Sequence, residues 1–144
     1  MTVIDQSALL PYSAAQLFDL VNDIASYPAF MDGCLAATVL ETRDNEITAR
    51  LELGKAGLRY AFTTRNTLVP PASMHMELVE GPFRKFAATW TFRELNDSAC
   101  KVSLLMTFEF STGLVDAALK RLFESMSRNL VNAICRRADE LYGK

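Results

Sequence analysis

Two stretches of the chain decide its fold: FAATWTF at residues 86–92 and VSLLMTFEF at residues 102–110. In both stretches every second residue is apolar, and the residues between them include threonine, serine and glutamate. Successive side chains of a β-strand point to opposite faces of the sheet, so this alternation predicts two strands with one buried face. The Asn96-Asp97 turn between them predicts that they run antiparallel.

The same alternation extends through the middle of the chain. It predicts six successive antiparallel strands, at residues 34–42, 46–54, 57–68, 72–80, 84–95 and 99–110. Turn residues separate them, at Asp44-Asn45, Gly54-Lys55-Ala56-Gly57, Pro70-Pro71, Gly81-Pro82 and Asn96-Asp97. A further strand is predicted at residues 3–10, before Pro11. The sheet is therefore expected to have seven strands.

Helical signals lie on either side of this central region. Ser13 and Gln16 form a capping-box pattern that predicts a helix over residues 14–22, and residues 26–33 predict a second, very short helix. Apolar residues recur every three or four positions from Leu114 to Leu141, which predicts one long amphipathic helix. The order β-α-α-β6-α is typical of an α+β fold in which a curved sheet wraps around the C-terminal helix.

Length and composition limit the possible functions. The 144 residues are enough for one domain, spanning 1–144, and the net charge of −2 gives no general attraction to nucleic acid. The N-terminus lacks the pattern of a signal peptide, and no apolar run is long enough to span a membrane, so a soluble cytoplasmic protein is expected. The cysteines, Cys34, Cys100 and Cys135, lie far apart and are expected to be reduced and mostly buried.

One face of the predicted sheet is apolar throughout. Its residues are Ile47, Ala49, Leu51, Leu53, Leu58, Tyr60, Phe62, Met74, Met76, Leu78, Phe86, Ala88, Trp90, Phe92, Val102, Leu104, Met106, Phe108 and Phe110. Such a face forms either an ordinary packed core or the wall of a cavity. The small residues Ala49 and Ala88 and the inward methionines favour a cavity with an adaptable lining.

The same alternation argues against an enzyme. Acid-base and nucleophilic catalysis need titratable groups inside a cleft, whereas the charged residues of these strands point outward. His75 is out of phase with Met74 and Met76, and is expected at the surface. Tyr60 is the one inward residue with a titratable hydroxyl, so it is the candidate for any catalysis; a hydrogen bond to the backbone is the commoner role.

Several motifs together resemble a known family. They are Leu10-Pro11-Tyr12-Ser13-Ala14, Leu20-Val21-Asn22-Asp23-Ile24, Ser26-Tyr27-Pro28 with Phe30 and Gly33-Cys34, Lys55-Ala56-Gly57, Phe62-Thr63-Thr64-Arg65-Asn66, Gly81-Pro82-Phe83 with Lys85, Trp90-Thr91-Phe92, and Phe108-Glu109-Phe110. As a set they resemble the coenzyme Q-binding START-like proteins, within the polyketide cyclase/START superfamily. The resemblance covers nearly the whole chain and is strongest to the bacterial branch named for the ribosome-association toxin RatA. One departure is Asp32, where proline is usual.

The resemblance implies a helix-grip fold, START or Bet v 1-like, with a hydrophobic tunnel for ubiquinone or a related polyisoprenoid lipid. Carried over to this chain, the tunnel lining is expected to comprise Leu51, Tyr60, Phe62, Met74, Met76, Leu78, Trp90, Phe92, Met106, Phe108, Leu122, Met126 and Leu130. The mouth is expected at Tyr27, Pro28, Phe30 and Phe83. Phe83 follows a tight turn, where it contacts a membrane or a protein partner, or else folds inward.

Three functions remain open at this point. The leading one is a ubiquinone carrier or chaperone that supports respiration, without a cofactor or metal, in the cytoplasm or peripherally at the inner membrane. The second is a toxin that binds the large ribosomal subunit and blocks subunit association. Its support in the sequence is a basic set on the last helix, Lys120, Arg121, Arg128, Arg136 and Arg137. The third is an enzyme of the cyclase or hydrolase type.

Overall fold

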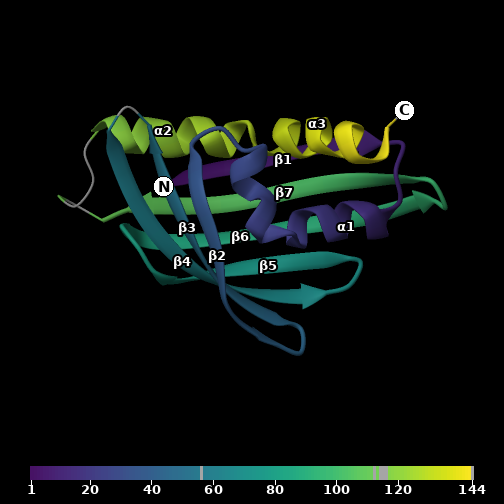
Figure 1. The fold of residues 1–144 in the computed structure, drawn as a ribbon, viewed down its shortest axis with the longest axis horizontal. Coiled ribbons are helices and arrows are strands. Elements are labelled where there is room, and N and C mark those ends of the chain that lie inside the picture. The colour runs from purple at the N-terminus through teal and green to yellow at the C-terminus, as the bar shows by residue number, and fades with distance from the viewer. Residues whose placement is uncertain (56, 112, 114–116, 144) are drawn as a thin grey trace.

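The computed structural model of the chain describes residues 1–55, 57–111, 113 and 117–143, without the side chain of Leu58. The described elements are β1 (Thr2–Leu10), α1 (Ala14–Asn22), the 3-10 helix η1 (Ile24–Ala29), β2 (Cys34–Arg43), β3 (Glu46–Lys55), β4 (Leu58–Val69), β5 (Ser73–Glu80), β6 (Phe83–Asn96), β7 (Ala99–Phe110), α2 (Ala117–Arg128) and α3 (Leu130–Tyr142) (Figure 1). The strands and α1 agree with the predicted ranges to within one residue. Ala56 of a predicted turn, and Leu114, Val115 and Asp116 of the predicted last helix, lie outside the described residues.

Within the described residues the strands form one seven-stranded sheet, in the order β1-β7-β6-β5-β4-β3-β2, with every pair antiparallel. Figure 1 shows that β2, β3 and β4 cross the direction of the other strands, so the sheet is strongly curved. Helix α2 contacts β3 and β4, α3 contacts β1 and β7, and α1 contacts β6 and β7. The helices therefore cover the concave face, as the element pattern predicted.

The chain enters α1 through the predicted capping box. The backbone N–H of Gln16 donates to Ser13 Oγ over 3.2 Å, and the backbone N–H of Ser13 donates to Gln16 Oε1 over 3.0 Å. These two bonds satisfy donors that a helix N-terminus otherwise leaves free. The predicted very short helix is present as the six-residue 3-10 helix η1, which begins and ends earlier than residues 26–33 and buries Tyr27.

The predicted long C-terminal helix is interrupted at Asn129, between α2 and α3. This residue has φ −102° and ψ 0°, outside the helical range, and separates α2 from α3. Its side-chain amide donates to the carbonyl of Ser125 over 2.9 Å, which is the local competition with helix hydrogen bonding that asparagine offers. The spacing of apolar residues continues unchanged across Asn129, so the sequence pattern did not predict the interruption. Leu141, predicted on the apolar face, is half exposed.

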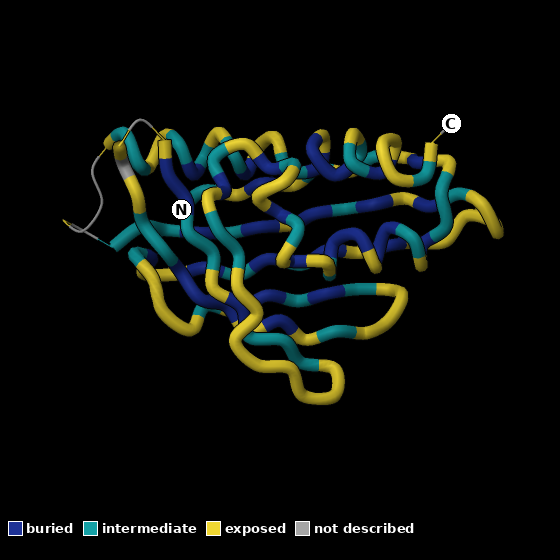
Figure 2. The backbone as a smooth tube through the Cα atoms, in the orientation of Figure 1, coloured by how far each residue is buried: buried dark blue, intermediate teal, exposed yellow. Residues whose placement is uncertain are grey.

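The sheet has one buried and one exposed face, as the alternation predicted. Met74, Leu104 and Val102 are fully buried, and Figure 2 shows buried segments along the strands behind the helices. The inner face of β4 is nevertheless polar at one end: Thr64 and Asn66 are buried, and Thr64 Oγ1 donates to Asn66 Oδ1 over 2.9 Å. The inner side is therefore not apolar along its whole length.

None of the described helices combines the length and the apolar character that crossing a membrane requires.

Candidate functional site

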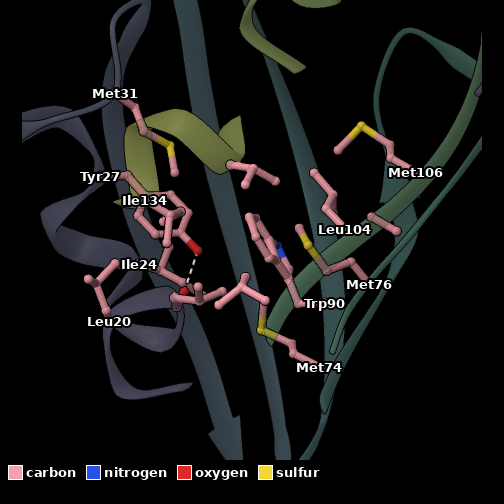
Figure 3. Packing of buried hydrophobic residues seen from close by; sticks show 14 of the residues in the cluster. Leu20, Ile24, Tyr27, Met31, Met74, Met76, Trp90, Leu104, Met106 and Ile134 are labelled. Atoms are coloured by element: carbon pink, nitrogen blue, oxygen red, sulfur yellow. Dashed lines mark hydrogen bonds between the residues drawn. The ribbon is translucent and has the colours of Figure 1, made fainter. Parts of the chain in front are cut away.

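A small cavity lies between the concave face of the sheet and the helices. Its volume is about 60 Å³. Its lining residues are Tyr27, Met31, Cys34, Leu51, Leu53, Phe62, Met76, Phe86, Trp90, Met106, Phe123, Met126, Ser127 and Leu130. Figure 3 shows Tyr27 and Met31 on one side of this region and Met76, Trp90 and Met106 of the sheet on the other. The wall is almost entirely apolar, which agrees with the predicted inner face.

The cavity is much smaller than the tunnel expected from the sequence. An engineered cavity that accepts benzene has about 150 Å³, so a quinone ring does not fit unless side chains move. Beside the cavity, six aromatic rings pack around Phe123 of α2. Phe123 is 4% exposed, and its ring centroid lies 4.8 Å from that of Phe108 and 4.9 Å from that of Phe83.

Phe83 belongs to this aromatic cluster and not to the mouth. It is 5% exposed and stacks on Phe110, with 5.0 Å between the ring centroids. Gly81, just before it, has φ +157°, and a Cβ there would lie 2.6 Å from Phe62 Cβ. The close backbone approach at Gly81 lets the turn fold over the cluster and bury Phe83. The alternative in which this ring points outward is therefore wrong.

The other expected mouth residues lie in and after η1. Tyr27 is buried in the cavity wall and donates a hydrogen bond to the carbonyl of Val21 (dashed in Figure 3). Phe30 packs edge-on against Tyr27 with centroids 5.9 Å apart, and the guanidinium of Arg137 lies 5.3 Å from the centroid of its ring. Pro28 is exposed and lines neither the cavity nor the pocket outside it.

The structure brings some of the expected lining residues together and leaves others outside the cavity. Those in the wall are Leu51, Phe62, Met76, Trp90, Met106, Met126 and Leu130. Met74, Phe92 and Phe108 are buried in the surrounding core, Tyr60 and Leu78 pack at its margin, and Leu122 lines a second pocket outside the cavity.

Sequence reasoning did not select several residues that line the cavity. Leu53 and Phe86 share the inward parity, and Phe123 fits the helical period, so a signal for these existed. Met31, Cys34 and Ser127 lie in a loop, at a strand start and in a helix. Cys34 was expected to be buried, but no local pattern places these three residues at a cavity, because only the tertiary fold brings their segments against the sheet.

The titratable groups of the wall are held neutral. Burial raises the pKa of the Tyr27 hydroxyl above its usual range, and raises that of the Cys34 thiol to about 11. The hydroxyl of Ser127 donates to the carbonyl of Phe123 over 2.8 Å and is therefore engaged. Neutral, partly engaged groups are poorly suited to act as nucleophiles or general bases near neutral pH.

Tyr60, the candidate for catalysis, lies beside the aromatic cluster. Burial raises its pKa above the usual range, and its hydroxyl has no hydrogen-bond partner among the described residues. The expected hydrogen bond to the backbone is therefore absent there. His75 lies on the outer face, where Nδ1 is 2.8 Å from Thr89 Oγ1. In the part of the chain that the structure describes, no group of three or more His, Cys, Asp or Glu side chains could hold a metal ion.

The chain has named relatives that match it over nearly its whole length. It is 46% identical over 142 residues to the ribosome association toxin RatA of Pseudomonas aeruginosa, covering 99% of each chain. It is 42% identical to the protein of that name from Vibrio cholerae, over the full length of both. A more distant relative, 22% identical over 93% of this chain and 67% of its own length, is the mitochondrial coenzyme Q-binding protein COQ10 of Dictyostelium discoideum.

The fold is shared with solved structures of low sequence identity. The Zhui aromatase/cyclase from Streptomyces sp. R1128 superposes with a TM-score of 0.83 at 18% identity, over 96% of this chain and 94% of that one. Residues 10–135 match the model of the family described as polyketide cyclase / dehydrase and lipid transport. The helix-grip architecture, the apolar inner face and this match agree, and the chain belongs to that family.

Proposed function

We propose that this chain associates with the ribosome, with the large subunit as its partner, and that this association interferes with the joining of subunits. The observation that carries the proposal is the identity of 42–46% over essentially the whole length to proteins named ribosome association toxins. The relative named for coenzyme Q binding shares only 22%. The order of the two functions expected from the sequence is therefore reversed.

The outer face of α2 and α3 supports this proposal by its charge. Residues 117–142 carry five basic and three acidic side chains in a protein of net charge −2. Arg128 pairs with Glu124 over 3.0 Å, and Arg137 with Glu140 over 3.4 Å. Lys120 and Arg121 are exposed and form no ion pair with any residue described in the structure. These two cations are available for the phosphates of ribosomal RNA.

Sedimentation of ribosomes with the purified chain tests this proposal. We expect added protein to raise the fraction of free subunits and to co-sediment with the large one, more strongly at low than at moderate salt. The variant Lys120→Glu/Arg121→Glu should lose most of this effect. The matched control Arg93→Glu/Lys101→Glu reverses two exposed charges on neighbouring positions of β6 and β7, and should keep it. Unchanged subunit profiles at both salt concentrations would exclude the proposal.

We propose as a second function that the cavity binds an apolar ligand, in line with the lipid-transport part of the family description. The specific observation in its favour is a hydrophobic cavity bordered by the flexible side chains of Met31, Met76, Met106 and Met126. Burial of an apolar chain contributes roughly 25 cal/mol per Å² of surface removed from water. Ubiquinone is one candidate, although its ring requires the cavity to widen.

Lipid extraction and titration test the second function. We expect mass spectrometry of the purified protein to detect an isoprenoid or other single-chain lipid, and an added lipid of this kind to shift the emission of Trp90, the tryptophan of the cavity wall. Replacing Met76 by Phe should narrow the cavity and reduce this shift. Extracts without lipid, together with an emission of Trp90 that neither ubiquinone nor simpler apolar chains change, would contradict this function.

A further inference from the structure

A second pocket of about 90 Å³ lies directly outside the apolar cavity. It is formed where the loop after η1, the end of β3 and the junction of α2 and α3 meet. Its lining residues are Met31, Asp32, Lys55, Leu122, Ser125, Met126, Asn129, Leu130, Ala133 and Arg136. We call it the outer pocket. Its wall carries the charged side chains of Asp32, Lys55 and Arg136, unlike that of the cavity, so the two compartments are suited to different parts of one molecule.

The charge of the outer pocket is positive. Lys55 and Arg136 contribute two cations and Asp32 one carboxylate. Lys55 Nζ lies 3.9 Å from Asp32 Oδ2, with side-chain exposures of 66% and 94%, so this pair is weak. Arg136 forms no ion pair with the residues for which the structure gives positions. An anion bound here would meet a lysine and an arginine, both without strong competing partners.

Flexible apolar side chains separate the outer pocket from the cavity. Met31, Met126 and Leu130 line both compartments, so they form the partition between them. Met126 rests on Gly33, where a Cβ would lie 2.7 Å from its Sδ atom. Methionine changes rotamer at low cost, and no hydrogen bond holds an apolar partition closed. Rotation of Met31 and Met126 would therefore join the two compartments.

The partition favours a slender ligand. The cavity of about 60 Å³ holds neither an aromatic ring nor a whole alkyl chain until side chains move, but a saturated chain is narrow and flexible and can enter end first between rotated methionines. We propose that the outer pocket binds the anionic head group of a single-chain amphiphile, through Lys55 and Arg136, while the apolar tail passes between Met31 and Met126 into the cavity. This inference rests on the second proposed function, and it adds the class of ligand.

Calorimetric titration of the whole chain with three probes of equal tail length tests the inference. The probes are dodecanoate, dodecyl phosphate and uncharged dodecanol, each below its aggregation concentration. We expect both anions to bind about three- to tenfold tighter than dodecanol, because two cations contact the charged head group, although both side chains are exposed and each contact is therefore modest. The tighter of the two anions identifies the head group as carboxylate or phosphate.

Variants separate the head-group site from the tail site. Lys55→Gln/Arg136→Gln should lower the affinity for both anions to that for dodecanol and leave the affinity for dodecanol unchanged. The control Arg93→Gln/Lys101→Gln, on the outer face of the sheet, should change none of the three affinities. Met126→Trp should weaken all three probes, since the indole would block the partition. Thermal melts of each variant check that it is folded.

Two results would overturn the inference in different ways. If the anions and dodecanol bind equally, or if Lys55→Gln/Arg136→Gln leaves the anions unaffected, the head-group site is wrong while the apolar cavity stands. If none of the three probes binds, the apolar-ligand function fails together with the inference.

Discussion

Removing the ring of Phe123 should cause a large loss of stability. This side chain is 4% exposed and has six aromatic rings within 6.4 Å, measured between centroids: Tyr60, Phe62, Phe83, Phe86, Phe108 and Phe110. A buried Phe→Ala change costs about 3–5 kcal/mol, and this range already includes part of the energy of ring pairs. We expect Phe123→Ala to lose about 4–5 kcal/mol, near the upper end, because its ring partners lie on β4, β6 and β7 and so anchor α2 to the sheet.

Urea unfolding at equilibrium measures this loss, and a thermal melt should show a fall of about 10 °C or more. Leu141→Ala is the control, since Leu141 is 50% exposed on α3 and its truncation should cost less than about 0.5 kcal/mol. If Phe123→Ala does not fold, Phe123→Leu keeps part of the buried volume and should lose about 2 kcal/mol.

The truncation should also create space in which an apolar molecule can bind. Toluene should raise the melting temperature of Phe123→Ala or Phe123→Leu, because a dry space lined by apolar side chains binds such ligands. The unmodified chain, with a cavity of about 60 Å³, should respond much less. A loss below about 1.5 kcal/mol for Phe123→Ala would refute the reasoning, because it would mean that the aromatic cluster does not hold α2 on the sheet.

Three further predictions concern single residues. Tyr60→Phe removes a buried hydroxyl without a partner among the described residues, so the unfolding free energy should rise by about 1 kcal/mol; an equal loss in urea unfolding would reveal a hidden partner. Gly33→Ala should lower the unfolding free energy by about 1–3 kcal/mol, because φ is +90° and the new Cβ would contact Met126. In a Met126→Ala background this contact is gone, so only the cost of the backbone conformation should remain. If the two substitutions are fully additive, the contact does not contribute. Burial raises the pKa of Cys34 from 9.0 to about 11, so the thiol's contribution to stability is present below pH 9 and is lost as the pH rises towards 11. Cys34→Ala should lack this decline, and parallel stability curves for the two proteins would contradict it.

Local patterns were sufficient for the elements and for the two faces of the sheet. Alternation over residues 86–92 and 102–110 identified Trp90, Met106 and Phe108 as inward residues, and all three are buried. Strand alternation depends only on local backbone geometry, because successive side chains of any extended segment point to opposite sides. The Ser13 and Gln16 capping box was likewise readable, because its partners are three residues apart.

Some features could not be predicted from the sequence. They depend on side chains that compete for helix hydrogen bonds, or on how side chains from distant segments fill space. The break at Asn129 interrupts an apolar period that continues unchanged on both sides. The burial of Phe83 depends on the close approach of Gly81, just past β5, to Phe62 on the paired strand β4. The inner face of β4 was expected to be apolar, and the buried pair Thr64 and Asn66 shows that strand parity assigns a face but not its chemistry.

What the sequence determined by itself is therefore the order of the elements, the inward residues of the five strands β3 to β7 and the start of the first helix. Only the tertiary structure decided how much empty space remains between sheet and helices, and that Asp32, Lys55 and Arg136 meet around one outer pocket. The physical reason is the distance along the chain over which the interactions act. Side-chain direction follows from neighbouring residues, whereas the volume of a cavity and the convergence of charges depend on sheet curvature and on segments that lie far apart in the chain.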